Sequence, residues 1–355
     1  MQRLWVVVVI ALVGCEEPLV LGRSKPAGQG EAKRVEPPGP TRVAPDRVGR
    51  PDPGSALVQA PPDAAVQAPA AVTVFEVYSP MSMTLAGDTL MWTDPKGSLW
   101  SMPASGGKPT ELSHQHLPGR PMFMNLATHA GAVIASRQGD LVRVDVPEGP
   151  LVPLGLELGE DSLLEMVSDG TALYATSYEQ RSAIYKIVDG KKTKLLDHRS
   201  ASIEVRGGTL YALSYSTGTL VAVKTSGGTP RTIARGLPKP TGFDVDDTSA
   251  YAWCEKDATL RKIDLKTGKI TVLESKDLGN SDVVVADGDW VYLHTWLGPN
   301  QSKSLRVAKD GSRTEVLADE LTAPYDIAID DQWVFVSERD QNRILRFKKS
   351  EIVAL

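Results

Sequence analysis

The sequence predicts an all-β protein in which seven four-stranded units close into a ring, the architecture of a seven-bladed β-propeller. One phrase recurs seven times: a turn rich in Asp and Gly, then a short apolar and often aromatic strand. The first apolar residues of its copies lie 43, 40, 37, 40, 41 and 43 residues apart, at Leu90, Val133, Leu173, Leu210, Ala250, Val291 and Val334. A period near forty made of short strands is typical of propeller blades, which bury their apolar faces against their neighbours.

Each copy also continues into further strands through tight turns. In the last copy, Tyr325–Asp330 alternates as an inner strand, Trp333–Ser337 follows as the second strand and Arg343–Phe347 as the third. The turns from the third to the fourth strand supply the positive φ angles that hairpins require, with the pairs Gly106-Gly107, Asp189-Gly190, Gly227-Gly228, Thr267-Gly268 and Asp310-Gly311. These turns predict antiparallel four-stranded blades.

The seventh blade lacks a fourth strand of its own, because only eight residues follow Phe347. A β-like run, Val72–Tyr78, precedes the first copy and alternates as a paired strand would. We therefore expect this run to become the outer strand of blade seven, which joins the two ends of the domain and leaves no open sheet edge between the first and last blades.

Two phrases connect the repeats to known propellers. Leu90-Met-Trp-Thr-Asp94 resembles the YWTD repeat of lipoprotein-receptor propellers, and the run from Leu321 to Asp330 is similar to the inner-strand phrase shared by YWTD and NHL repeats. Only the first copy carries the full Trp-Thr-Asp core, and YWTD propellers have six blades where seven repeats occur here. The resemblance implies the propeller superfamily and not the receptor function, because a fold does not carry its function with it.

The first fifteen residues form a separate element. Arg3 precedes an apolar run of ten residues, Leu4–Val13, which is too short to span about 30 Å of hydrocarbon as a helix. The run ends in Leu12-Val-Gly-Cys15, which resembles the lipobox of bacterial lipoproteins, so residues 1–15 are expected to be a lipoprotein signal peptide with Cys15 as the acylated mature N-terminus. An ordinary secretory signal is the alternative. Glutamates rather than aspartate follow Cys15, which favours the outer over the inner membrane of the cell envelope by the sorting rule of enterobacterial lipoproteins.

Residues 16–71 are expected to form a disordered tether and residues 72–355 the propeller. The tether holds eleven prolines, ten alanines and no aromatic residue, so it cannot bury enough apolar surface to offset its chain entropy. The net charge of −5 predicts no nucleic-acid partner. Once Cys15 carries lipid, Cys254 is the remaining cysteine, and we expect it to be a buried apolar side chain in a monomer without disulfides.

Polar residues near the inner strands give the candidate site. Inner strands lie nearest the ring axis, so their side chains are expected to surround the mouth of the central channel; the candidates are Ser82, Asn125, Glu165, Ser202, Glu204, Asp244, Asp282 and Asp326. Carboxylates around one axis suit a divalent cation such as calcium, and propeller hydrolases of the gluconolactonase type hold calcium with Glu, Asn and Asp at such a place. The alternative is that these acids bind channel water and neighbouring backbone amides. No bound cofactor is otherwise indicated.

Motifs for phosphate loops, zinc hydrolases and nucleophile elbows do not occur, so no catalytic residue is assigned. The sequence favours a lipid-anchored, non-enzymatic binding module for a protein, peptide or glycan partner. The alternative is a metal-dependent propeller enzyme, similar to gluconolactonases or lyases, with its site at the channel mouth.

Labelled palmitate should enter the wild-type protein expressed in a bacterium and should not enter a Cys15→Ala variant, because that thiol is the expected acylation site. Palmitate that still labels the variant would contradict the lipobox interpretation.

Limited proteolysis should leave a resistant core that begins between Ala68 and Val74, where the aromatic-free stretch ends.

Overall fold

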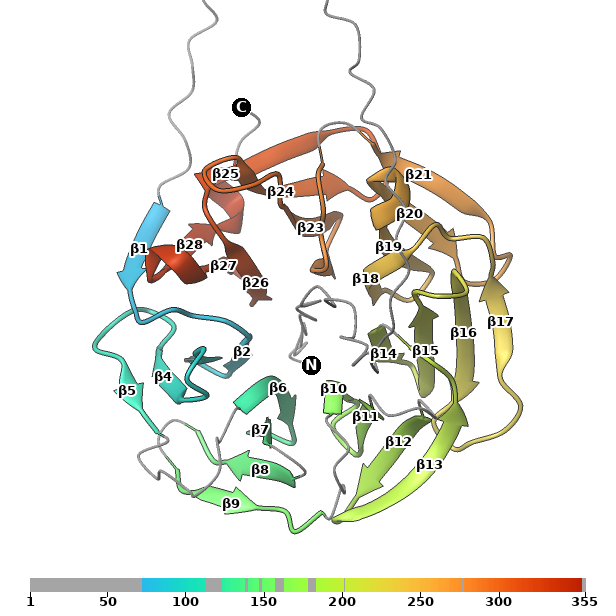
Figure 1. Cartoon of the computed structure of the whole chain (residues 1–355), viewed down its shortest axis with the longest axis horizontal. Helices are drawn as coiled ribbons and strands as arrows, with labels where there is room; N and C mark the ends of the chain where they lie inside the picture. Colours follow the sequence, from blue (N-terminus) through green and yellow to red (C-terminus); the bar gives the residue numbers. More distant parts are fainter. Residues whose placement is uncertain are drawn as a thin grey trace, which may run out of the picture. The chain divides into compact units, whose positions relative to one another are not determined.

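Seven antiparallel sheets of four strands each stand around a central axis in the computed structural model (Figure 1). The structure describes residues 72–112, 123–137, 140–146, 149–156, 163–177, 183–200, 202–275 and 278–352. The predicted all-β, seven-bladed propeller is confirmed. Cys15, the signal peptide and the 16–71 tether lie outside the described residues, so these expectations stay predictions.

We name the blades A to G in chain order. Their strands, from the axis outward, are in blade A β2 (Met83–Ala86), β3 (Thr89–Thr93), β4 (Leu99–Pro103) and β5 (Thr110–Glu111); in blade B β6 (Phe123–His129), β7 (Ala132–Arg137), β8 (Asp140–Val144) and β9 (Leu151–Pro153); in blade C β10 (Leu163–Ser168), β11 (Leu173–Ser177), β12 (Ala183–Val188) and β13 (Lys191–Asp197); and in blade D β14 (Ser202–Arg206), β15 (Thr209–Ser214), β16 (Thr219–Lys224) and β17 (Arg231–Ala234). Blade E holds β18 (Pro240–Val245), β19 (Ser249–Cys254), β20 (Thr259–Asp264) and β21 (Ile270–Glu274); blade F β22 (Val284–Asp287), β23 (Trp290–Thr295), β24 (Ser302–Ala308) and β25 (Thr314–Leu321); and blade G β26 (Pro324–Ile329), β27 (Trp333–Glu338), β28 (Arg343–Lys348) and β1 (Val72–Glu76). Short 3₁₀ turns are η1 (Glu255–Asp257), η2 (Arg339–Gln341) and η3 (Lys349–Glu351).

The ring has two faces that differ in their connections. The turn face carries the turns from the first to the second strand and from the third to the fourth; the loop face carries the other connections. Aspartates organise the turn face: Asp169 Oδ1 accepts hydrogen bonds from the amides of Thr171 (2.9 Å) and Ala172 (2.8 Å), and its Oδ2 accepts one from the Tyr174 hydroxyl (2.8 Å). The same arrangement recurs at Asp246 with Tyr251. The Asp-rich turns are therefore structural.

The ring closes as the sequence predicts. Strand β1 pairs antiparallel with β28 over five residues, from Val72 opposite Phe347 to Glu76 opposite Arg343. Phe75 packs into the core between blades G and A. Blade G is thus built from both ends of the described chain.

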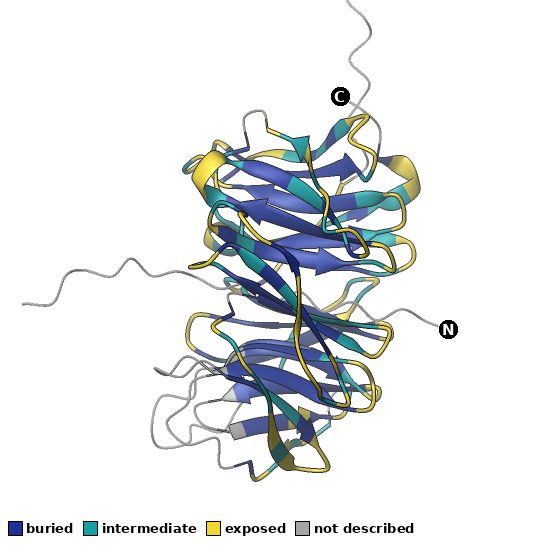
Figure 2. Ribbon diagram, turned by 90° about the vertical axis from the view of Figure 1, so that its right-hand side faces the viewer, coloured by how far each residue is buried: buried dark blue, intermediate teal, exposed yellow. Residues whose placement is uncertain are grey.

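The apolar core is divided among the joints between blades. Each of the seven joints holds its own buried cluster within the described residues. At the joint of blades G and A, Phe335 and Ile344 meet Trp92, Leu90 and Met83. Figure 2 shows the buried residues running along the strands, with exposed residues gathered at the turns. Cys254 is fully buried at the joint of D and E, as expected. Within the described ranges, no helix is long and apolar enough to cross a membrane.

Deleting Val72–Tyr78 should remove part of the core at the G–A joint and open the edge of β28. Phe75 is partly buried, so loss of its ring is expected to cost about 2–3 kcal/mol of the free energy of unfolding, and the open edge favours aggregation. Thermal unfolding and light scattering measure both effects. The control deletes the seven preceding residues, 65–71, and should melt like the parent; a Val72–Tyr78 deletion that stays monomeric and equally stable would refute the closure.

Candidate functional site

The candidate polar residues line the inner wall of the ring at two levels. Asn125, Glu165 and Asp326 lie beside register irregularities near the start of β6, β10 and β26. Glu204 and Asp244 lie farther along β14 and β18, opposite Tyr211 and Tyr251 of the second strands. Asp282 precedes β22. They therefore do not form one ring at the channel mouth, because inner strands carry them through different depths of the wall.

Glu165 connects blade C to blade D. Its side chain is buried, and its two carboxylate oxygens accept hydrogen bonds from the Ser202 hydroxyl and from the Ile203 amide, both at 2.7 Å. Both donors belong to β14, the inner strand of the next blade. A buried carboxylate that accepts amide and hydroxyl hydrogen bonds replaces the water that it lost.

Two aspartates repeat this arrangement at other joints. Asp244 Oδ2 of blade E accepts a hydrogen bond from the Ala286 amide of blade F at 2.7 Å. Asp326 Oδ2 of blade G accepts one from the Met83 amide of blade A at 2.7 Å, across the ring closure. We call Glu165, Asp244 and Asp326 the carboxylate clasps, because each joins two inner strands through the main chain of the next blade.

Burial makes several of these acids weak. It raises the pKa of Glu165 to about 8 and that of Asp244 to about 7, although hydrogen bonds from the next blade oppose both shifts. The pKa of Glu204 is raised well above its usual range by burial and then by the neighbouring charges of Asp244 and Glu165. Glu165, Glu204 and Asp244 of blades C, D and E are thus one electrostatic group.

A second group lies on blades F and G. Burial raises the pKa of Asp282 to about 6 and places that of Asp326 well above its usual range, with the charge of Asp282 adding to the second shift. Asn125 of blade B carries no titratable charge; its backbone N–H donates to Ser136 Oγ at 3.1 Å. Among the described residues, no three acidic, histidine or cysteine side chains come close enough to hold a metal ion.

His294 is a buried titratable residue that sequence reasoning left without a role. It lies on β23 opposite Ser304 of β24, and only 4% of its surface is exposed. Burial lowers its pKa to about 4, so its imidazole is neutral at physiological pH. His294 lies two residues after Tyr292 on the same strand, so both side chains point to one face, and Tyr292 belongs to the core at the F–G joint. This spacing is the signal in the sequence that predicts a buried histidine at that joint.

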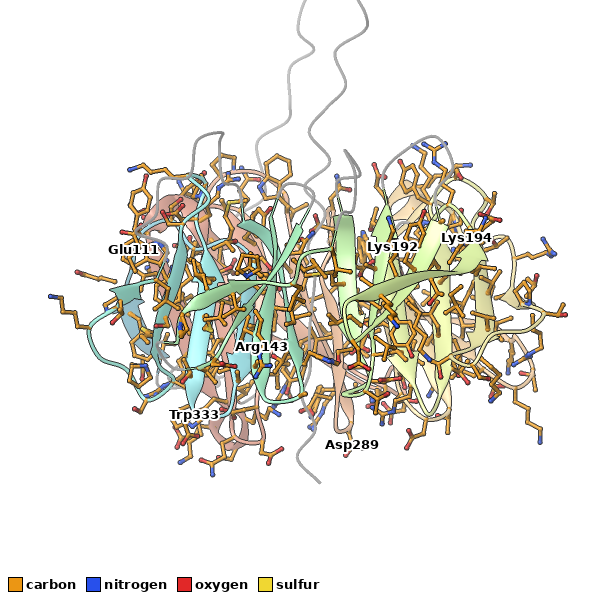
Figure 3. The ribbon with its side chains drawn as sticks, turned by 90° about the horizontal axis from the view of Figure 1, so that it is seen from below. Glu111, Arg143, Lys192, Lys194, Asp289 and Trp333 are labelled. Atoms are coloured by element: carbon orange, nitrogen blue, oxygen red, sulfur yellow. The ribbon has the colours of Figure 1, made fainter. Side chains whose placement is uncertain are left out.

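The turn face carries a groove of about 920 Å³ across blades G, A and B. Its wall includes the turns Gly87-Asp88 of blade A and Asp330 to Gln332 of blade G, and the side of Trp333. Figure 3 shows Trp333 and Asp289 on this same face of the ring, at the bottom of the view. The volume falls in the range of ordinary ligand sites. It lies at the turn-face ends of the inner strands β2, β6 and β26, whereas Asn125 and Asp326 of the sequence-predicted site lie near the starts of β6 and β26.

Arg346 of β28 holds the outer wall of this groove. Its guanidinium lies over the Trp333 ring at 4.2 Å and near the Phe75 ring at 5.2 Å, and Nη1 donates a hydrogen bond to the Ala104 carbonyl at 2.8 Å. The arginine therefore joins β1, β27 and blade A at one point. Acidic side chains remain at the rim of the groove, because Asp88 and Asp331 are exposed.

Sequence reasoning missed this groove because its parts lie at opposite ends of the domain. Asp88 and Asp331 are separated by most of the ring in sequence and become neighbours through closure. The available signal was the predicted pairing of Val72–Tyr78 with the last strand, which brings the turns of blades G and A together.

Comparisons with known proteins identify the fold and no family. No protein-family model matches the sequence, and no curated protein matches it. A catalytically inactive virginiamycin B lyase from Staphylococcus aureus, determined with quinupristin, superposes with a TM-score of 0.61 at 16% identity, covering 78% of this chain and 99% of the lyase. The computationally designed protein Ika8 superposes with a TM-score of 0.56 at 12% identity, covering 76% of this chain and 83% of Ika8. A chain of the nidogen/laminin complex superposes with a TM-score of 0.50 at 14% identity, covering 62% of this chain and 89% of that chain. The β-propeller implied by the YWTD resemblance is confirmed.

The buried acids predict that stability falls as pH rises above neutrality. A carboxyl with a raised folded pKa takes up a proton on folding, so its contribution is lost as pH rises from the unfolded pKa toward the folded value, here through about 7 and 8 for Asp244 and Glu165. His294 acts in the opposite direction, but between about pH 6.5 and 4, since its folded pKa is lowered. From pH 7 to 8.5 the histidines are mostly neutral in both the folded and the unfolded state, so the acids dominate; Glu165 and Asp244 alone are expected to lose about 1–2 kcal/mol, measured by thermal or chemical unfolding.

Glu165→Gln should reduce the slope of this dependence, because one of the raised acids is removed, while Glu111→Gln on outer strand β5 should leave the slope unchanged. Equal slopes in the wild type and Glu165→Gln would show that Glu165 does not take up a proton on folding. A different result would be a melting temperature that millimolar calcium raises in the wild type and leaves unchanged in the Glu165→Gln, Asp326→Asn double variant. That result would make these acids a cation site.

Proposed function

We propose that this protein is a non-enzymatic binding module, anchored in the bacterial cell envelope by lipid on Cys15, whose turn-face groove receives a basic segment of a partner protein or peptide. The observation that carries the proposal is the groove itself. It is a concave surface of about 920 Å³ with exposed carboxylates at its rim. Asp88 and Asp331 provide charge complementary to Lys or Arg.

The chemistry of the groove favours a peptide over a neutral glycan. Sugar rings commonly stack on an open aromatic face, but Arg346 already lies over the Trp333 ring. The remaining rim offers turn backbone, carboxylates and the Gln332 amide, which suit the main chain and the cationic side chains of a peptide. A groove built on turns between rigid strands needs little ordering when it binds.

The envelope address supports this role. A lipid on Cys15 and a tether of residues 16–71 would hold the domain near a membrane, and at about 3.1 Å per residue the tether could reach on the order of 150 Å when extended. The glutamates after Cys15 favour the outer membrane. A rigid ring on such a tether can present its groove to partners at varied distances.

A metal-dependent enzyme at the channel is the second candidate. The observation in its favour is the set of near-neutral pKa values at Glu165, Asp244 and Asp282, since shifted acids gather at active sites. Against it, Glu165 and Asp244 already bind the main chain of the next blade, which accounts for their position. The binding module therefore explains more of the molecule.

Charge reversal at the groove tests the proposal. Asp88→Lys with Asp331→Lys should repel a basic segment, and we expect at least tenfold weaker retention of the partner in cross-linked pull-downs from solubilised envelope. Asp289→Lys with Asp310→Lys, two exposed acids of blade F on the same face, makes the same change in charge outside the groove. A partner lost equally from both variants, or from neither, would remove the groove from the binding surface.

A further inference from the structure

Positive charge is concentrated in one sector of the ring. Residues 183–240 contain ten Lys and Arg against three Asp and Glu, whereas the rest of the chain contains 29 Lys and Arg against 41 Asp and Glu. This segment forms the outer half of blade C and all of blade D. The net charge of −5 therefore conceals a strongly basic sector in an otherwise acidic protein.

The basic side chains of this sector cover its outer wall. Six of them are exposed and lie on or beside the outer strands of the two blades: Lys191, Lys194, Arg199, Lys224, Arg231 and Arg235. We call these six the basic rim. Lys191, Lys224 and Arg231 lie toward the turn face, and Arg199 and Arg235 follow β13 and β17 toward the loop face, so the charge extends across the thickness of the ring. Figure 3 shows Lys194 with its neighbour Lys192 on this wall.

Among the described residues, only one member of the basic rim has an acidic partner. Lys194 pairs with Asp197 at 2.9 Å, but the other five form no ion pair within the described part of the chain. Lys224 donates a hydrogen bond to Thr209 Oγ1, Arg231 to the Leu265 carbonyl and Arg235 to Thr232 Oγ1. These neutral acceptors orient the cations and leave their charge uncompensated.

The shape of the basic rim suits a broad anionic surface. It is the convex outer wall of two adjacent blades, and the groove of the turn face lies on blades G, A and B instead. Tyr185, whose ring lies under Lys192 at 4.7 Å, is half-buried, and no aromatic side chain among the described residues of blades C and D is exposed for bases to stack on. A linear polyanion binds best along a continuous basic groove, and this convex wall has its basic side chains dispersed. Dispersed lysines and arginines match the dispersed charges of lipid headgroups.

We propose that the basic rim of blades C and D rests on the anionic headgroups of a membrane and holds the ring edge-on to it. This inference rests on the proposed lipid anchor, which supplies the membrane, but not on the identity of the groove's partner. The field of anionic headgroups extends about a Debye length, near 10 Å, and attracts each nearby Lys or Arg enough to strengthen binding about fivefold. Six such residues give reversible adsorption.

The arrangement is compatible with the point where the chain enters the ring. That point is Val72 on blade G, and blades C and D are the two farthest from G in the ring order (Figure 1). A compact domain of this size has a radius of gyration of about 19 Å and is about 50 Å across, so an extended tether is long enough to pass it. With the outer wall of C and D on the membrane, the turn face stands perpendicular to it, so the groove on G, A and B opens parallel to the membrane and stays uncovered. The partner would then reach the groove while the ring rests on the membrane.

The test uses the chain from Glu16 onward, which carries the whole ring and lacks the acylated cysteine. At low salt this protein should sediment with vesicles of equal parts phosphatidylcholine and phosphatidylglycerol, and it should stay in the supernatant with vesicles of pure phosphatidylcholine. Reversal of three basic-rim charges, Lys191→Glu, Lys224→Glu and Arg235→Glu, should weaken retention at least tenfold. The control reverses three exposed lysines of blade E, Lys256→Glu, Lys266→Glu and Lys269→Glu, and should keep most of it.

Three results would overturn the inference. They are no retention by anionic vesicles, equal losses in the two triple variants, and binding to soluble dextran sulfate, dependent on the basic rim, without binding to vesicles. The last would assign the basic rim to an anionic polymer. Thermal unfolding checks that both triple variants are folded. The basic-rim variant leaves Asp88 and Asp331 intact, so it should still bind the groove's partner. Loss of vesicle binding with the partner retained concerns this inference alone, and loss of the partner concerns the binding-module proposal.

Discussion

Closure of the ring is the constraint on which the other features depend. A propeller blade buries its apolar faces only against its neighbours, so seven blades in an open row would leave two faces and one sheet edge exposed. Strand β1 prevents this by completing blade G from the opposite end of the domain. The same joint receives Phe75 in its core, the Asp326 clasp across the inner strands, and the bond from Arg346 to Ala104 farther out. Inner, middle and outer contacts therefore reinforce one joint.

The carboxylate clasps add polar contacts between neighbouring inner strands to the apolar clusters at the joints. Inner strands converge on the axis and leave little room for large side chains, yet their backbone groups must still be satisfied. Glu165, Asp244 and Asp326 reach across to amides of the next blade and fix the relative position of neighbouring inner strands. Burial of a carboxylate costs free energy that these hydrogen bonds offset only in part, which is why their pKa values rise. An arrangement that resembles a cation site in the sequence is thus accounted for by assembly of the ring.

The surface divides into parts with different chemistry. The turn face near the closure carries the acidic groove, and the wall of blades C and D carries the basic rim. These two surfaces lie on different blades of the ring, so a membrane and a protein partner could be engaged together without competing. Charge separation of this kind is invisible in the net charge of −5, because the positive charge of residues 183–240 offsets part of the negative charge of the rest.

The sequence by itself determined the repeat, the number of blades and the strand that closes the ring. Each of these follows from local chemistry: turn residues with positive φ, alternating apolar residues, and a spare strand before the first blade. It also named the acids that line the channel wall, with Ser202 beside them. Tertiary structure decided what those acids do. Glu165 binds Ile203 and Asp244 binds Ala286 about forty residues away, and Asp326 binds Met83 at the other end of the domain. The groove depends in the same way on turns that closure brings together. Periodicity fixes which side chains point inward, but the depth of each residue and its partner in the next blade depend on how seven sheets meet around an axis.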